Sequence, residues 1–219
     1  MYEYVKKSEY APVRAELETI IKKVQIEMRK KHKLTFQFQL IGSGQGHLVT
    51  RIRGGNRGYD FDYNLILQHP GNERYKAAQI KRNFMEALDK AVKGTRYSFS
   101  EDSTSAITIK VVDKKNKKIC YSCDFAVVYD GRCGERDGFY YLRHNKKQNR
   151  YEFVFRPLEP GIKEKVKKIR ARDQGWNHIR EEYLKLKNIN KVKEKHSYFL
   201  YMEAVHNVYH RLFYQNFEE

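Results

Sequence analysis

Cysteine, proline and tryptophan are scarce in this sequence, and long apolar runs are missing. Its 219 residues include 3 cysteines, 4 prolines and 1 tryptophan. A small, odd number of cysteines does not build a disulfide framework, which fits a reducing compartment. Because no apolar run reaches the ~20 residues needed to cross a bilayer, we expect no membrane partner. The segment Met1–Lys7 lacks the apolar stretch of a signal peptide, so we expect a cytoplasmic protein.

Acidic residues are also few relative to basic ones. The chain has 27 Asp and Glu against 44 Lys and Arg, which gives a net charge of +17. Such a surplus attracts polyanions, so RNA or another polyanion is an expected partner, although a well-solvated basic surface is the plainer alternative. The 17 tyrosines and 12 phenylalanines exclude general disorder. The length favours one large domain, or one domain with an appendage.

Hydrophobic periodicity predicts two long helices and a sheet in the first part of the chain. Residues 8–31 carry an apolar stripe with helical spacing, with Ser8 as the expected N-cap, and residues 77–91 repeat that spacing. Residues 34–41 alternate apolar and polar side chains as a strand does, and they end at the glycine-rich loop Gly42–Gly46.

The remainder predicts more strands followed by helices. Segments 96–99, 106–112 and 119–129 are typical of strands, the last two forming a hairpin, and segments 139–143 and 151–155 predict another hairpin. From Gly161 onward the apolar spacing is helical. We therefore expect an α+β fold with a C-terminal helical block.

Asp60 and Asp62 stand at alternate positions of one predicted strand. Side chains two apart on a strand lie on the same face, so the two carboxylates converge. Like charges held close together repel unless a cation lies between them, and paired carboxylates suit magnesium bound with phosphates. The apolar run Leu65–Leu67 that follows is typical of an inner strand, where acids need a partner or a metal.

Asp124 is a third candidate, because it is the only charged residue between Lys118 and Asp130 in a strand otherwise suited to burial. The Gly42-Ser43 loop, the Asp60-x-Asp62 strand, a helix and the Asp124 strand follow one another along the chain. This order resembles the DNA polymerase beta-like nucleotidyltransferase superfamily, nearest the cyclic GMP-AMP synthase and oligoadenylate synthase branch. The resemblance covers residues 8–129.

The resemblance implies an architecture. It is a twisted mixed, largely antiparallel sheet flanked by long helices, with a C-terminal helical block. Residues 1–157 would be the nucleotidyltransferase catalytic core, and residues 158–219 a helical region packing on it.

The resemblance also implies roles for five residues. Gly42 would let the backbone approach the phosphates of a nucleoside triphosphate, and Ser43 would donate hydrogen bonds to them. Asp60 and Asp62 would hold two Mg²⁺ (or Mn²⁺) ions, one of them shared with Asp124 and the attacking hydroxyl. Asp124 would in addition ease loss of the proton from that hydroxyl.

The implied activity is transfer of a nucleoside monophosphate from an NTP, taken as ATP, to a hydroxyl acceptor, with release of pyrophosphate. The acceptor would be RNA or a nucleotide in second-messenger synthesis. The alternative is a non-catalytic nucleic-acid-binding module that retains the fold.

One departure from the family pattern is the length of the connection between loop and strand. Sixteen residues separate Ser43 from Asp60, which is longer than usual, so residues 45–59 would form an extended loop or hairpin beside the site. Its arginines, Arg51, Arg53 and Arg57, either contact the substrates or are solvated, and the insertion could alter or abolish activity.

A rival motif is Cys120-x-x-Cys123, with Cys133 and His144 downstream, which superficially offers zinc ligands. Cysteines three apart on one strand point to opposite faces, which favours free thiols over a zinc site.

Overall fold

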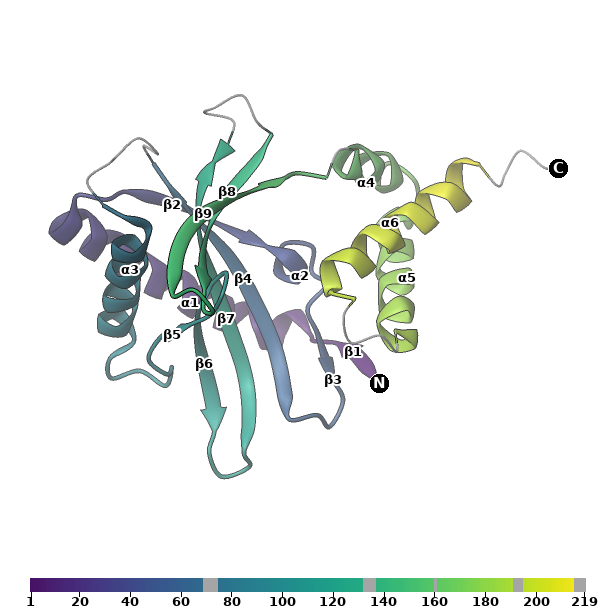
Figure 1. The fold of residues 1–219 in the computed structure, drawn as a ribbon. Coiled ribbons are helices and arrows are strands. Elements are labelled where there is room, and N and C mark those ends of the chain that lie inside the picture. Colours follow the sequence, from purple (N-terminus) through teal and green to yellow (C-terminus); the bar gives the residue numbers. More distant parts are fainter. Residues whose placement is uncertain (69–74, 132–136, 160, 191–194, 215–219) are drawn as a thin grey trace. The chain divides into compact units, whose positions relative to one another are not determined.

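The chain divides into a core unit and a helical unit. The computed structural model describes residues 1–68, 75–131, 137–159, 161–190 and 195–214 (Figure 1). The core unit is Val5–Leu158, and the helical unit combines Met1–Tyr4 with Glu159–Glu219. The predicted Cys133 lies outside the described residues.

A seven-stranded mixed sheet organises the core unit. Four of its strands are paired in the order β2-β4-β7-β6, β5 pairs β6 at the edge, and β8 pairs both β7 and β9. Only β4 and β7 run parallel, and the other pairs described in this sheet are antiparallel. The bounds are β2 (Phe36–Ile41), β4 (Arg57–Leu67), β5 (Glu101–Asp102), β6 (Ile107–Asp113), β7 (Lys118–Asp130), β8 (Gly138–Asn145) and β9 (Arg150–Pro157).

Two long helices, α1 (Lys7–Glu27) and α3 (Ala77–Val92), supply apolar side chains to the core of this unit. A π-helical turn, η1 (Met28–His32), extends α1, so the expected helix over residues 8–31 is confirmed with a different last turn. The N-cap prediction is wrong. Lys6 is the cap, because its carbonyl accepts hydrogen bonds from the backbone N–H groups of Glu9 and Tyr10, which places Ser8 inside the first turn.

Alternation along β4 separates the core from the polar face of the sheet. The odd-numbered residues pack in one hydrophobic cluster with residues of α1 and α3, as do those of β7 around the buried Phe125. The even-numbered residues, Asp60 and Asp62 among them, therefore lie on the opposite face. The buried odd-numbered residues of β4 are Tyr59, Phe61, Tyr63, Leu65 and Leu67.

The segment before Asp60 is more ordered than a loop. It contains part of a short helix, α2 (Gly42–Gln45), a strand, β3 (Thr50–Ile52), and the first residues of β4. In contrast, residues 96–99 are not a strand, although the backbone N–H of Ser98 donates to the carbonyl of Lys110 at 2.8 Å.

The helical unit contains α4 (Ile162–Arg170), α5 (Gly175–Ile189), α6 (Ser197–Phe213) and the short strand β1 (Tyr2–Tyr4). Its own hydrophobic cluster includes Ile169, Ile179 and Val205, which are fully buried. The N-terminal strand joins this unit because the Tyr4 hydroxyl donates to the Arg180 carbonyl at 2.6 Å. The division into residues 1–157 and 158–219 as functional domains stays a prediction.

The predicted fold class is confirmed: a mixed, largely antiparallel sheet with long helices, followed by a helical block. No helix in the described part of the chain is long and apolar enough to cross a membrane.

Gly58 allows β4 to approach β7 next to the aspartates. A Cβ at this position would lie 1.6 Å from the backbone oxygen of Cys120. We expect Gly58→Ala to lower the free energy of unfolding by at least about 3 kcal/mol, because the two strands would have to separate.

The matched control is Gly54→Ala, whose φ of +69° strains an alanine but whose Cβ would meet nothing within 4 Å. We expect it to cost about 1–2 kcal/mol. Urea denaturation measures both, and equal losses would contradict the close approach at Gly58.

Candidate active site

Parallel pairing of β4 with β7 brings the three predicted aspartates to one region of the sheet. Asp62 pairs in register with Asp124, and Asp60 pairs with Ser122. All four side chains belong to the face opposite the hydrophobic core. Asp60 is exposed, whereas Asp62 and Asp124 are partly buried.

The neighbouring strands extend this row in both directions. On β2, Ile41 pairs with Asp62, and on β6, Thr108 pairs with Asp124. Since Gly42 directly follows Ile41, the end of β2 delivers the glycine-rich loop to the Asp62 carboxylate.

Gly42 lies against Asp62. A Cβ added at Gly42 would be 2.7 Å from Asp62 Oδ2, and the residue has a φ of +63°, which L side chains rarely adopt. Any other residue here would both be strained and displace the carboxylate. Ser43 follows in the first turn of α2, and its carbonyl accepts a hydrogen bond from the Leu48 N–H at 2.8 Å.

Hydroxyl groups hold two of the carboxylates. Ser122 Oγ donates to Asp60 Oδ1, and Thr108 Oγ1 donates to Asp124 Oδ1 at 2.5 Å. Ser122, on β7, is the register partner of Asp60, and Thr108, on β6, is the register partner of Asp124. From the residues that the structure describes, no hydrogen bond reaches the second oxygen of either carboxylate.

Burial, reinforced by neighbouring carboxylates, raises the pKa of Asp62 and of Asp124. Burial, and then the charges of Asp124 and Asp60, raise the pKa of Asp62 from 3.8 to about 7. The pKa of Asp124 is also raised by burial, partly offset by the Thr108 hydrogen bond and reinforced by Asp60. On the opposite face of the sheet, burial in the hydrophobic core raises the pKa of the Cys123 thiol well above its usual value.

The donor set fits a divalent cation of the hard type. The charges of Asp60 and Asp124 add to burial in raising the pKa of Asp62, a cation bound there would offset that repulsion, and oxygen is the ligand that Mg²⁺ prefers. Within the described ranges no three His, Cys, Asp or Glu side chains already converge as a metal cage. Asp60 accepts a hydrogen bond from Ser122 and Asp124 accepts one from Thr108, so these two contacts set the orientations of the two carboxylates.

Sequence reasoning did not single out Thr108 and Ser122. Both are ordinary polar residues in alternating strands, and only the strand register reveals that they face the acids. The nearest signal in the sequence is their position: Ser122 is two residues before Asp124, on the same face of one strand.

The arginines of the 45–59 segment lie at its surface. Arg51 forms an ion pair with Glu9 at 2.5 Å, and Arg53 and Arg57 are exposed. The ion pair gives Arg51 a partner within the protein. A substrate contact by these three residues stays a prediction.

The two cysteines that the structure describes are free thiols. Cys123 is buried and Cys120 is partly buried, and neither forms a disulfide. His144 is paired with Asp102, 2.9 Å from Nδ1 to the carboxylate, and not with a cysteine. These contacts give no support to a zinc site.

Comparison with known proteins shows similarity of fold. No family model and no curated protein matches the chain. Among solved structures, the 3′-deoxy ATP-bound form of DncV from Vibrio cholerae has a TM-score of 0.57 and 15% identity, over 94% of this chain and 53% of DncV. Another structure of DncV, described as a cyclic AMP-GMP synthase and prokaryotic cGAS homolog, has a TM-score of 0.56 and 12% identity, over 83% and 61%.

A third similar structure is the STING-associated CdnE c-di-GMP synthase from Capnocytophaga granulosa, with a TM-score of 0.56 and 16% identity over 93% of this chain and 60% of CdnE. The chain thus spans about half to three fifths of the length of these neighbours. The predicted resemblance to the cyclic GMP-AMP synthase-like branch is confirmed as a likeness of fold.

The raised pKa of Asp62 predicts a pH-dependent stability. Its folded value of about 7 lies above the usual 3.8, so the folded protein binds more protons between these values and loses stability as pH rises through them. Asp62→Asn should therefore stabilise the metal-free protein, with a gain that grows between pH 4 and 7. One pKa unit corresponds to about 1.4 kcal/mol, so the gain at pH 8 is at most about 4 kcal/mol.

Urea denaturation in EDTA at pH 4, 6 and 8 measures this gain. Asp89→Asn, on α3, serves as the control. A pH-independent difference between Asp62→Asn and the wild type would contradict the raised pKa.

Proposed function

We propose that this chain is a metal-dependent nucleotidyltransferase. It would transfer a nucleoside monophosphate from an NTP to a hydroxyl acceptor, with pyrophosphate as the second product. The observation that carries the proposal is the registered pairing of Asp62 with Asp124, with Gly42 packed against the Asp62 carboxylate. The likeness of fold to cyclic dinucleotide synthases supports it.

The protein's residues divide the work of binding. Asp60, Asp62 and Asp124 would hold Mg²⁺ or Mn²⁺ through their carboxylate oxygens. When bound, the cations supply positive charge that offsets the charge of the phosphates and of the oxygens that enter and leave. Gly42, with no side chain to obstruct the approach, and the Ser43 hydroxyl would contact the triphosphate.

Asp124 would take the proton of the attacking hydroxyl. A general base works best when its pKa lies near the working pH, and burial moves the pKa of Asp124 upward. The Thr108 hydrogen bond to Oδ1 leaves Oδ2 as the proton acceptor. Asp62, with the higher degree of mutual repulsion, would serve only as a ligand.

The acceptor is proposed to be a nucleotide or RNA, and the donor ATP. The fold neighbours carry the names of cyclic AMP-GMP and c-di-GMP synthases, which favours second-messenger synthesis for this chain. The expected cytoplasmic location would place the protein with its NTP substrates.

The proposed activity predicts metal-dependent pyrophosphate release. The full chain is incubated with all four NTPs and Mg²⁺ or Mn²⁺, with and without RNA, and products are separated by mass. Asp60→Ala/Asp62→Ala should reduce turnover at least ~10³-fold, because loss of both carboxylates removes the cation that offsets charge in the transition state.

The matched control is Asp173→Ala, an exposed aspartate of the helical unit, which should retain wild-type turnover. Undiminished turnover in the double variant would sink the mechanism. No turnover under any condition would favour the non-catalytic alternative.

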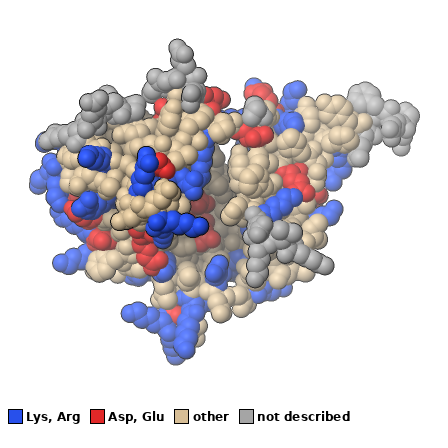
Figure 2. All heavy atoms as spheres, in the orientation of Figure 1, with Lys and Arg blue, Asp and Glu red and all other residues tan. Residues whose placement is uncertain are grey.

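The alternative, a nucleic-acid-binding module, has one specific observation in its favour. The turn between β6 and β7, with the first residue of β7, carries four lysines in five positions: Lys114, Lys115, Lys117 and Lys118. Of these, Lys118 is the register partner of Asp113 and its charge contributes to lowering the pKa of that carboxyl. Figure 2 shows basic side chains grouped at its lower end, where Figure 1 places this turn. The turn itself is held by Asp113, which accepts hydrogen bonds from the backbone N–H and the side-chain amide of Asn116.

The lysine turn predicts salt-sensitive RNA binding. Changing its four lysines to alanine should weaken binding of a single-stranded RNA and reduce the slope of log K against log [salt], by about 0.7 for each lost phosphate contact. Fluorescence anisotropy at 50–200 mM salt measures both.

The matched control removes the same charge elsewhere, from four exposed lysines on or beside the two long helices: Lys22, Lys23, Lys30 and Lys93. Equal loss in the two variants would show that net charge alone attracts RNA and that the turn is no binding surface.

A further inference from the structure

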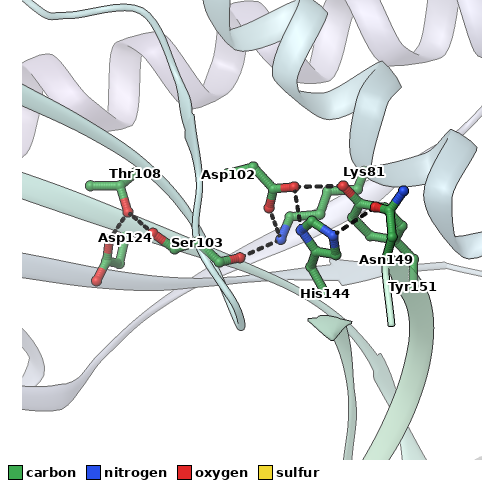
Figure 3. A network of polar contacts seen from close by, with 8 residues as sticks. All are labelled: Lys81, Asp102, Ser103, Thr108, Asp124, His144, Asn149 and Tyr151. Carbon is green, nitrogen blue, oxygen red and sulfur yellow. Dashed lines mark hydrogen bonds and ion pairs between the residues drawn. The ribbon is translucent and has the colours of Figure 1, made fainter. Parts of the chain in front are cut away.

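A continuous chain of polar contacts leads from Asp124 to a buried lysine. Figure 3 shows Asp124, Thr108 and Ser103 in a row, followed by Lys81 and Asp102. Thr108 Oγ1 is 2.5 Å from Asp124 Oδ1, and Ser103 Oγ is 3.1 Å from Thr108 Oγ1. These residues come from three strands or strand ends and from α3.

Counting protons fixes the direction of these bonds. A carboxylate accepts only, so Thr108 gives its single hydroxyl proton to Asp124. The bond between the two hydroxyls must then be donated by Ser103, because Thr108 has no proton left. The Asp124 carboxylate is thus held by a chain in which each hydroxyl has one defined role.

Lys81 fixes the far end of this chain. It is only 2% exposed, and its Nζ donates to the Ser103 carbonyl at 2.6 Å and pairs with Asp102 Oδ1 at 2.5 Å. Because Ser103 is clamped through its backbone, its hydroxyl is presented to Thr108 at a defined position.

Asp102 is in turn held from the neighbouring hairpin of β8 and β9. The Tyr151 hydroxyl donates to Asp102 Oδ2 at 2.6 Å, and His144 Nδ1 lies 2.9 Å from the same oxygen. The rings of Tyr151 and His144 are stacked with centroids 4.0 Å apart. One carboxylate therefore ties together α3, the edge strand β5 and the hairpin.

A buried ion pair of this kind contributes little to stability, because removing two charges from water costs about as much free energy as their attraction returns. Burial lowers the pKa of Lys81, against the pull of Asp102, which shows that the ammonium group is kept there at a cost. Apolar residues of similar volume often serve stability as well or better. The pair is better explained by the position it gives to Ser103.

We propose that Thr108 is a positioning residue for the Asp124 carboxylate, and that the Lys81–Asp102 pair holds Thr108 in place through Ser103. This inference rests on the proposed function for the role of Asp124. It adds to the site four residues from outside the acidic trio. The side chain of Thr108 acts through Asp124 and does not contact substrate.

The central test compares Thr108→Val with Thr108→Ser. Valine keeps the shape of threonine but lacks the hydroxyl, while serine keeps the hydroxyl. We expect Thr108→Val to lower Mn²⁺ affinity and kcat by ~10–100-fold with KM for the NTP nearly unchanged, and Thr108→Ser to stay within about threefold of the wild type. Calorimetric Mn²⁺ titration gives the affinity without any turnover.

Coupling between the two ends of the chain is measured in a double-mutant cycle. Lys81→Met/Asp102→Asn removes the ion pair without leaving an unpaired charge. Its effect on Mn²⁺ affinity should largely disappear in the Thr108→Val background, whereas independent effects that multiply would overturn the role of the ion pair. If this variant does not fold, Ser103→Ala takes its place.

Crystal structures of the wild type and Thr108→Val separate this inference from the proposed function. We expect one Asp124 orientation in the wild type and a different or mixed orientation in the variant. An unchanged orientation overturns the inference. If Thr108→Val changes the Asp124 orientation but the wild type turns over no NTP, the positioning role is supported and only the proposed function is wrong.

Discussion

The parallel pairing of β4 with β7 is the contact on which the candidate site depends. It is the one parallel pair among the strand pairs described in the core sheet, and it sets Asp62 directly beside Asp124. A shift of one residue would turn the acids of one strand to the hydrophobic face. The close approach at Gly58 and the buried odd-numbered side chains hold this register, because each of them fits only one pairing.

The folded chain bears an electrostatic cost at the site. Each of two acids is supported by one hydroxyl, while Asp62 lies against Gly42 and is repelled by the charges of Asp124 and Asp60. Such a cost is hard to explain as a device for stability, since neutral residues would fit the same strands at lower free energy. Clusters of groups with perturbed pKa values are typical of functional sites.

The sequence was informative where local periodicity determines the structure. Alternation predicted that Asp60 and Asp62 share a face, and helical spacing predicted α1 and α3 within a few residues. It could not predict the cap at Lys6, where the carbonyl and not a side chain begins the helix. It also could not identify Thr108 or Lys81, because their roles follow from strand register and from the packing of α3. Lys81 is buried, whereas the periodicity of the helix alone would place a charged residue on the solvent side.

The basic character of Asp62 has a consequence for how a metal ion would enter. A carboxyl group with a pKa of about 7 is half protonated in neutral, metal-free solution. A cation can bind only after that proton leaves, so uptake of metal is an exchange of one ion for another. If the proposed site binds a cation, its apparent affinity would fall about tenfold with each pH unit below neutrality, so acid would empty the site.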